Sequence, residues 1–206
     1  YNALTERLAW SWSQQRQFVS AVSHELQTPL TLVSGSLKRG MRKAPDLDPA
    51  LKQRLQDAQD ETTDMQQLLN DLLDLSRSDS GRLQVKKEAV PLQPLLETIV
   101  RVQGPAYGRT LELKEANDQA ALIALGDPSR LHQVLVNLVE NAHKYSPPDQ
   151  PIQLTLARVA EGLQVEVIDH GMGISSTDQP HIFERFHRGS NTGGYSGSGL
   201  GLSVVK

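Results

Sequence analysis

The stretch from Phe18 to Leu37 reads FVSAVSHELQTPLTLVSGSL and decides the first half of the fold. Apolar residues recur in it at spacings of three or four: Phe18, Val22, Leu26, Leu30, Val33 and Leu37. This spacing places them on one face of an α-helix. The pattern predicts a single long amphipathic helix over residues 1–41.

A second amphipathic helix is predicted from Pro49 to about Ser78. Asp48 followed by Pro49 is typical of a helix start, because the carboxylate can cap main-chain N–H groups and proline fits the first turn. The apolar stripe of this helix comprises Leu51, Leu55, Ala58, Met65, Leu68, Leu69, Leu72 and Leu75. Residues 42–48 form a polar turn, so the two helices make a hairpin. One hairpin cannot bury both stripes, and we expect a homodimer in which two hairpins form a four-helix bundle.

The chain changes character after residues 78–81 (SDSG), which we interpret as the start of a linker. Asp127-Pro128 repeats the helix-start pattern, and alternating apolar residues favour an antiparallel strand pair around Glu161-Gly162. The predicted strands are residues 83–90, 111–115, 121–125, 152–159 and 163–169, and the predicted helices are 92–102 and 128–145. Residues 171–199 form a loop that is too long to be a simple connection. The second half is therefore a mixed α/β domain.

Composition and charge exclude several classes of protein. A net charge of −3 without clustered Lys and Arg gives no basis for a nucleic-acid partner. The absence of cysteine excludes disulfides, thiolate catalysis and cysteine-based zinc sites. No apolar run approaches the roughly 18 residues of a membrane span, so we expect these residues to be soluble. The histidines that we interpret as surface or incidental residues are His132, His143, His170, His181 and His187.

The first motif with chemical potential is SHELQTPL, residues 23–30. His24 lies two residues from an apolar position on either side, so it should point away from the apolar stripe. A neutral, exposed imidazole is a competent nucleophile, and Glu25 can accept the proton of its other nitrogen. Thr28, one helical turn further on, can position a water for the reverse, hydrolytic reaction. Taken alone, such a histidine is more often an ordinary surface residue.

The second motif lies on the helix predicted after Asp127-Pro128. Asn137, Asn141 and Lys144 are spaced at i, i+4 and i+7, so they share one helix face. The amide oxygen of Asn141 is a ligand that Mg²⁺ accepts beside phosphate oxygens, and Lys144 offers a positive charge to phosphate. Tyr145 is placed to stack on a purine or hydrogen-bond to it. The alternative is a solvated helix face.

Two glycine motifs follow. Asp169, at a strand end, is placed to accept a hydrogen bond from an exocyclic amine such as that of adenine, and Gly171 and Gly173 let the main chain approach a flat ligand. The second glycine motif opens the last helix, where free main-chain N–H groups favour phosphate binding. Its candidate residues are Gly197, Gly199, Leu200 and Gly201.

Residues 182–188 (IFERFHR) lie between the two glycine motifs. We expect Phe183 and Phe186 to pin a mobile loop to the core, while Arg185 or Arg188 reaches a phosphate. The alternative is a short amphipathic turn.

In this order and spacing, the five motifs resemble those of the sensor histidine kinases of two-component signalling, and the resemblance covers essentially the whole chain. The matching boxes are the histidine box (23–30), the asparagine box (137–146), the first glycine box (169–174), the phenylalanine box (182–188) and the second glycine box (197–202).

The resemblance implies a dimerisation and phosphotransfer hairpin followed by a Bergerat-type ATP-binding domain, an α/β sandwich. It implies that His24 attacks the γ-phosphate of Mg-ATP and passes the phosphoryl group to an aspartate of a response regulator receiver domain. By the same resemblance, Glu25 is the acid or base, Asn141 the magnesium ligand and Asp169 the adenine reader. Glu25 with Thr28 resembles the E-x-x-T phosphatase pattern, so phosphatase activity toward the regulator is expected too.

The domain boundaries follow from this resemblance. Residues 1–15 resemble the end of a HAMP relay helix, residues 16–80 the dimerisation and phosphotransfer domain, and residues 81–206 the ATP-binding domain. The relay helix implies a membrane-spanning sensor upstream, at the cytoplasmic face of the inner membrane. The chain begins without methionine, and the family's ATP domain continues past the position of Lys206. We therefore expect a piece of a longer protein, cut short at its C-terminus.

Other interpretations remain open at this point. Gln27 stands where the family usually has Arg or Lys, which removes a charge beside His24. An ATPase of the gyrase or heat-shock-ninety type would use the same ATP fold. A water-activating glutamate at position 137 would favour such an ATPase, and Asn137 argues against it. A dimeric scaffold with a degenerate nucleotide pocket is the non-enzymatic alternative.

Overall fold

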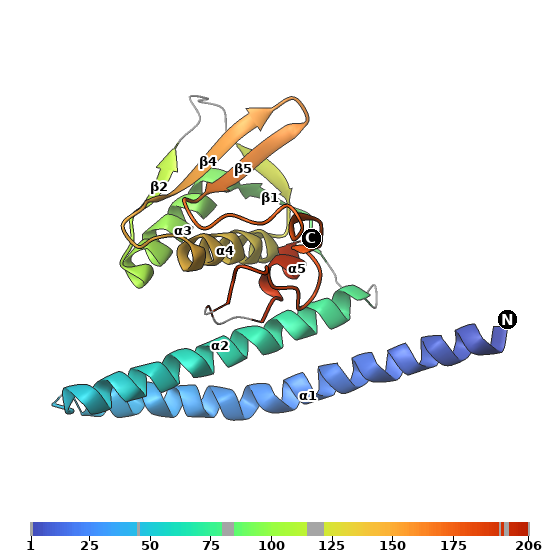
Figure 1. Ribbon diagram of the computed structural model, residues 1–206, viewed down its shortest axis with the longest axis horizontal. Helices are drawn as coiled ribbons and strands as arrows, with labels where there is room; N and C mark the ends of the chain where they lie inside the picture. The colour runs from blue at the N-terminus through green and yellow to red at the C-terminus, as the bar shows by residue number, and fades with distance from the viewer. Residues whose placement is uncertain are drawn as a thin grey trace. The chain divides into compact units, whose positions relative to one another are not determined.

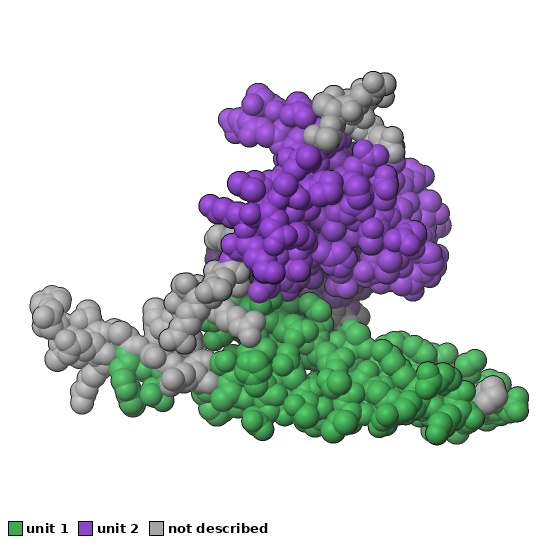
Figure 2. Space-filling view, turned by 180° about the vertical axis from the view of Figure 1, so that it is seen from behind, with its two compact units in different colours: residues 1–83 green, residues 84–206 purple. Residues whose placement is uncertain are grey.

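The chain forms two compact units, residues 1–83 and residues 84–206 (Figure 2). The computed structural model describes residues 2–44, 46–79, 85–114, 122–193, 195 and 198–205. No helix within these ranges combines the length and apolarity that crossing a bilayer requires.

The first unit is a helical hairpin of α1 (Asn2–Lys43) and α2 (Pro49–Asp79) (Figure 1). Asp48 caps α2 as predicted, because its Oδ1 accepts hydrogen bonds from the N–H groups of Ala50 at 2.9 Å and Leu51 at 3.2 Å. α1 is continuous through Pro29. The predicted helical hairpin is therefore confirmed.

The two helices of the hairpin contact each other through polar side chains. Three hydrogen-bonded pairs, which we call the polar seam, join α1 to α2: Gln27–Asn70 at 2.7 Å, Thr31–Gln66 at 3.3 Å and Ser34–Gln59 at 2.9 Å. The apolar stripe of α1 stays largely open within one chain, since Phe18 is 68% exposed and Leu26 46% exposed. Another surface is needed to cover it.

The second unit contains two small sheets. β1 (Glu88–Pro91) pairs antiparallel with β3 (Ile123–Gly126). β4 (Ile152–Val159) lies between β2 (Leu111–Lys114), which is parallel to it, and β5 (Gly162–Ile168), which is antiparallel.

The predicted β4–β5 hairpin is confirmed, with Val159 opposite Gly162. The first strand was predicted over residues 83–90, but β1 begins only at Glu88 and runs to Pro91, because it has a partner strand only there. Residues 83 and 84 lie outside the described ranges.

The helices of the second unit are α3 (Leu92–Tyr107), α4 (Pro128–Tyr145), the short 3₁₀ helix η1 (Gln179–His181) and α5 (Gly201–Val205). Asp127 caps α4 as predicted, accepting hydrogen bonds from the N–H groups of Ser129 at 2.9 Å and Arg130 at 3.2 Å. α3 runs past its predicted end at residue 102 and stops at Gly108, whose φ of 58° ends the helix.

One apolar core joins these elements. α3 and α4 cover one face of the strands (Figure 1), and alternate residues of β4 point into the core between them. The core comprises Val90, Leu92, Leu96, Ile99, Leu111, Leu122, Leu135, Val139, Ala142, Ile152, Leu154 and Leu156. The predicted fold class, a helical hairpin followed by an α/β sandwich, is confirmed.

Candidate functional site

The three residues predicted to act in phosphotransfer are together on α1. His24, Glu25 and Thr28 are all exposed, whereas Ser23 beside them is only 2% exposed. Gln27 is engaged with the second helix, because its Nε2 donates to Oδ1 of Asn70. The imidazole of His24 is therefore accessible on the surface of the hairpin, and the chemical roles of the three residues stay predictions.

The predicted polar face of α4 lies against the start of α5. Asn137 is 4% exposed, and its Nδ2 donates a hydrogen bond to the carbonyl oxygen of Gly201 at 3.1 Å. Asn141 and Lys144 are half-buried further along the same face, and Lys144 Nζ lies 5.1 Å from the centre of the Tyr145 ring. The structure thus brings the asparagine motif together with the glycine-rich start of α5.

The end of β5 meets the end of α4. Asp169 Oδ1 accepts hydrogen bonds from the N–H of Gly171 at 2.7 Å and from Ser146 Oγ at 3.2 Å. A Cβ at Gly171 would lie 2.7 Å from the carbonyl oxygen of Tyr145, so only glycine fits at this close approach. Tyr145 of the asparagine motif therefore forms one small cluster with Asp169 and Gly171 of the first glycine motif.

The glycine-rich stretch before α5 packs against the phenylalanine motif, residues 182–188. The N–H of Phe186 donates to the carbonyl oxygen of Gly199 at 3.0 Å, and a Cβ at Gly199 would lie 2.7 Å from the carbonyl oxygen of His187. Gly199 has a φ of 71°, which also favours glycine. Leu200 is fully buried, and its N–H donates to Ser198 Oγ at 3.2 Å. Gly197 lies outside the described residues.

The prediction that Phe183 and Phe186 pin this loop to the core is wrong, because the two side chains are 41% and 63% exposed. Polar contacts hold the loop instead. Arg188 Nη2 donates to the carbonyl oxygens of Thr192 and Tyr195, and the Tyr195 ring lies 5.2 Å from that of Tyr145, centre to centre. Arg185 is exposed. Contact of either arginine with phosphate stays a prediction.

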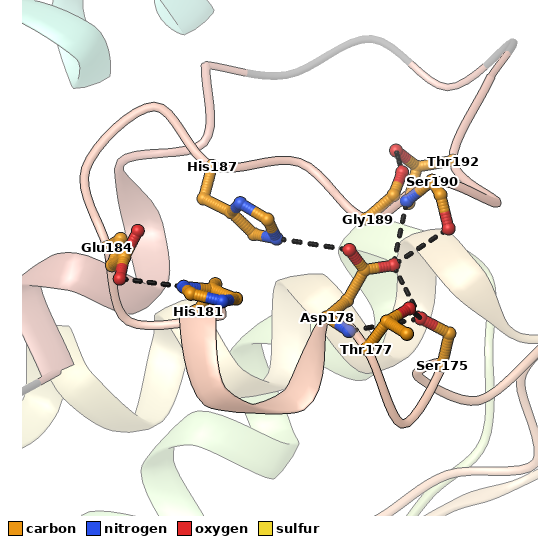
Figure 3. Close-up of polar contacts among 9 residues, drawn as sticks. All are labelled: Ser175, Thr177, Asp178, His181, Glu184, His187, Gly189, Ser190 and Thr192. Carbon is orange, nitrogen blue, oxygen red and sulfur yellow. Dashed lines mark hydrogen bonds and ion pairs between the residues drawn. The ribbon is translucent and has the colours of Figure 1, made fainter.

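Sequence reasoning missed Asp178, a buried carboxylate in the same loop (Figure 3). Its Oδ2 accepts hydrogen bonds from Ser175 Oγ at 2.7 Å, from the Ser190 N–H at 2.9 Å and from Ser190 Oγ at 2.9 Å. These donors, the Ser190 N–H first, lower the pKa of Asp178 to about 2. The sequence did offer a signal, because Asp178 lies two residues before Pro180, which resembles the helix-start pattern of Asp48-Pro49 and Asp127-Pro128. The Asp178 carboxylate nevertheless makes no helix-capping hydrogen bond.

Two of the histidines interpreted as surface or incidental residues are half-buried. His187 Nε2 lies 3.4 Å from Asp178 Oδ1 (Figure 3). His143 stacks on Tyr107 with ring centres 4.2 Å apart, and burial, aided by the nearby Arg109 charge, lowers the pKa of His143. His132, His170 and His181 are exposed, as predicted.

Two protein-family models match the chain. The family described as "His Kinase A (phospho-acceptor) domain" matches residues 14–81, which include α2 and all but the first turns of α1. The family described as "Histidine kinase-, DNA gyrase B-, and HSP90-like ATPase" matches residues 126–206, from the end of β3 onward.

Individual proteins are similar over nearly all of the chain. "Sensor histidine kinase YkoH" of Bacillus subtilis is 32% identical over 211 residues, which covers 100% of this chain and 45% of YkoH. "Signal transduction histidine-protein kinase/phosphatase MprB" of Mycolicibacterium paratuberculosis is 30% identical over 215 residues, which covers 100% of this chain and 40% of MprB. The chain spans less than half the length of these relatives.

A solved structure has the same fold. Full-length ShkA, crystallised in complex with AMPPNP, superposes with a TM-score of 0.69 at 24% identity, over 92% of this chain and 39% of the ShkA chain.

Proposed function

Because the chain belongs to the sensor histidine kinases of two-component signalling, we propose that it transfers the γ-phosphoryl group of Mg-ATP to His24 and then to an aspartate of a response regulator receiver domain. The observation that carries this proposal is the meeting of three separate motifs in the second unit. Asn137 contacts Gly201, and Tyr145 contacts Gly171. Such convergence favours a nucleotide site over a solvated helix face.

The adenine end of the site is proposed at Asp169. Its Oδ1 is oriented by Ser146 and by the Gly171 N–H, which leaves Oδ2 as the oxygen that can accept from a ligand. A carboxylate held in this way is suited to accept a hydrogen bond from an exocyclic amine. The lack of a side chain at Gly171 lets the main chain pass close to the Tyr145 carbonyl oxygen and Asp169, and Gly173 continues this turn with a φ of 70°.

The phosphate end is proposed between α4 and the start of α5. Lys144 supplies positive charge, and the main chain from Gly197 to Gly201, with Arg185 or Arg188, supplies donors. Within the described residues no three acidic or histidine side chains gather as a metal site. A magnesium ion would therefore rest on the Asn141 amide oxygen together with phosphate oxygens and water. When bound, it would neutralise charge on the phosphates.

The phosphoryl acceptor is proposed to be the exposed imidazole of His24. Glu25 would accept the proton from one ring nitrogen while the other attacks phosphorus, so that the bond to the departing ADP oxygen breaks as the N–P bond forms. Positioning and charge neutralisation carry most of the catalysis in such transfers. Thr28 would orient a water for dephosphorylation of the regulator, and the relative MprB is named a kinase/phosphatase.

A homodimer is proposed from the uncovered stripe of α1. Phe18, Val22, Leu26 and Val33 are between 37% and 68% exposed in one chain. A second hairpin would bury these side chains in the apolar core of a four-helix bundle. Light scattering at micromolar concentration tests this, and a monomeric mass would argue against the bundle.

The full-length protein is proposed to carry a membrane-spanning sensor before residues 1–15. These residues form a relay segment that leads into the phosphotransfer domain (16–80) and the ATP-binding domain (81–206). Supporting this organisation, the match to the phospho-acceptor family begins at residue 14 and ends at residue 81.

Incubation with γ-labelled ATP and magnesium tests the proposed kinase activity. We expect an acid-labile label on the parent chain and none on a His24→Gln variant. His132→Gln, which removes an exposed histidine from α4, is the matched control and should be labelled like the parent. Label that survives in His24→Gln would overturn the assignment of His24, and an unlabelled parent would overturn the proposed activity.

A further inference from the structure

Asp178 joins two segments of the long loop in the second unit (Figure 3). Ser175 belongs to the segment that follows the Asp169 motif, and Ser190 belongs to the segment that leads to Gly199. The carboxylate binds both, through hydrogen bonds of 2.7 to 2.9 Å. One buried side chain thus closes the loop between the proposed adenine end and the proposed phosphate end.

A second contact ties the same two segments together. Asn191, next to Ser190, donates from its Nδ2 to the carbonyl oxygen of Gly173 at 3.1 Å. The position of residues 190 and 191 is therefore defined at two points of the first segment. Gly189 allows the two segments to approach closely, because a Cβ there would lie 3.6 Å from Asp178 Oδ2 and 3.1 Å from Asn191 Oδ1.

The closed loop connects directly to the glycine-rich stretch. Residues 186–190 (Phe-His-Arg-Gly-Ser) form a short run in which Ser190 and His187 contact Asp178, while the Phe186 N–H binds the Gly199 carbonyl. This run packs directly against Gly199, because the His187 carbonyl oxygen lies 2.7 Å from where a Gly199 Cβ would be. Asp178 contacts this intervening run and not Gly199 itself.

We propose that Asp178 is a positioning residue of the nucleotide site: by binding Ser175 and Ser190 it fixes residues 186–190, and through them the main chain at Gly199, for binding of the nucleotide phosphates. This inference rests on the proposed function. It adds a residue outside the five motifs to the machinery of the site.

A carboxylate suits this position better than an amide. All three hydrogen-bond partners of Oδ2 are donors, two hydroxyl groups and one main-chain N–H. An asparagine would keep one oxygen for these donors but lose the negative charge that strengthens each of the three hydrogen bonds. Because its pKa is low, Asp178 keeps its charge throughout the neutral range.

The Asn191 contact reaches Gly173, but the contacts that hold Tyr145 and Asp169 at the adenine end lie outside this network. Tyr145 accepts a hydrogen bond from the Met172 N–H at 3.3 Å, and Ser146 binds Asp169. Neither contact involves Asp178. Loss of the Asp178 carboxylate should therefore weaken binding of phosphates while leaving binding of the base intact, which a general loss of folding would not do.

Calorimetric titration of the full chain with Mg-ATP and with adenosine tests this separation. For Asp178→Ala and Asp178→Asn we expect affinity for Mg-ATP to fall by about ten-fold or more, with adenosine affinity within about two-fold of the parent. The matched control is Asp149→Asn, an exposed carboxylate on the turn after α4, which should bind both ligands as the parent does. Equal losses for Mg-ATP and adenosine, or no loss for either, would overturn the positioning role.

Hydrogen exchange provides a readout that needs no nucleotide. The Ser190 amide, protected by Asp178 in the parent, should exchange faster in Asp178→Ala, and so should its neighbours from 186 to 190. In a Ser190→Ala background, the further effect of Asp178→Ala on exchange should be smaller than in the parent. Unchanged protection would overturn the inference by itself. A parent chain that binds no Mg-ATP would instead overturn the proposed function.

Discussion

Gln59 on α2 donates a hydrogen bond from Nε2 to Ser34 Oγ on α1 at 2.9 Å, and both side chains are buried, at 4% and 6% exposure. A buried polar group without a partner is unfavourable, so this pair penalises any slip of one helix along the other. The polar seam thereby specifies which face of α1 meets α2. It turns His24 and the apolar stripe outward.

Substitution of Ser34 by Ala should destabilise the hairpin by about 1 kcal/mol, because Gln59 loses its buried acceptor across the helices. Urea unfolding of the full chain, followed by far-ultraviolet circular dichroism, measures this. Ser36→Ala is the control, since Ser36 is exposed and bonds only within α1. Adding Gln59→Leu to Ser34→Ala should restore much of the stability, and a further loss of the same size would contradict this account of the seam.

Substitution of Gly171 by Ala should weaken Mg-ATP binding by about ten-fold or more. The new methyl group would lie 2.7 Å from the Tyr145 carbonyl oxygen and 2.8 Å from Asp169 Oδ1, so the proposed adenine reader must move. Calorimetry checks this with adenosine as well as with Mg-ATP, and both affinities should fall. Gly40→Ala on α1, where a Cβ meets nothing within 4 Å, should leave them unchanged.

The second unit should lose stability as the pH falls through the ordinary histidine pKa of 6.5. Burial and the Arg109 charge lower the pKa of His143 in the folded chain, so the unfolded chain binds the proton more readily. The contribution of neutral His143 to the free energy of unfolding is complete above pH 6.5 and is lost progressively below it. Unfolding by urea at a series of pH values measures the slope. His143→Phe keeps a ring against Tyr107 and should reduce the slope, and a slope equal to that of the parent would exclude His143 as its source.

Substitution of Thr28 by Ala should remove phosphatase activity while preserving autophosphorylation of His24. The hydroxyl is proposed to orient water only in the hydrolytic direction, and loss of such positioning lowers a rate on the order of 100-fold. Release of phosphate from a labelled response regulator measures the activity. Thr28→Ser, which keeps the hydroxyl, should retain most of it. Parallel loss of both activities in Thr28→Ala would assign Thr28 to the hairpin's structure instead.

Local patterns sufficed to predict much of this fold. The 3.6-residue period of α1 and the Asp48-Pro49 and Asp127-Pro128 starts depend on neighbours in the sequence, and all were found in the structure. The face of α1 that meets α2 was not predicted. A search for apolar residues passes over Ser34, whose burial depends on Gln59, a residue 25 positions away.

The candidate site divides in the same way. Asn137, Tyr145, Asp169 and Gly171 were predicted from motif spacing, and the structure brings them into contact with one another or with α5. Asp178 was missed because its partner Ser190 lies 12 residues away in an irregular loop, where no periodicity relates the two. The mistaken role for Phe183 and Phe186 has the related cause that apolar residues were expected to point inward.

The crowding around Gly199 has a genetic consequence. The atoms that a Cβ would meet there, the His187 carbonyl oxygen and the Phe186 carbonyl carbon and Cα, all belong to the main chain. A second-site change that only trims a side chain cannot open this space. A selection for revertants of Gly199→Ala should therefore return true reversions to glycine, whereas defects at Ser34 or Asp178, where side chains make the contacts, should admit compensating changes elsewhere.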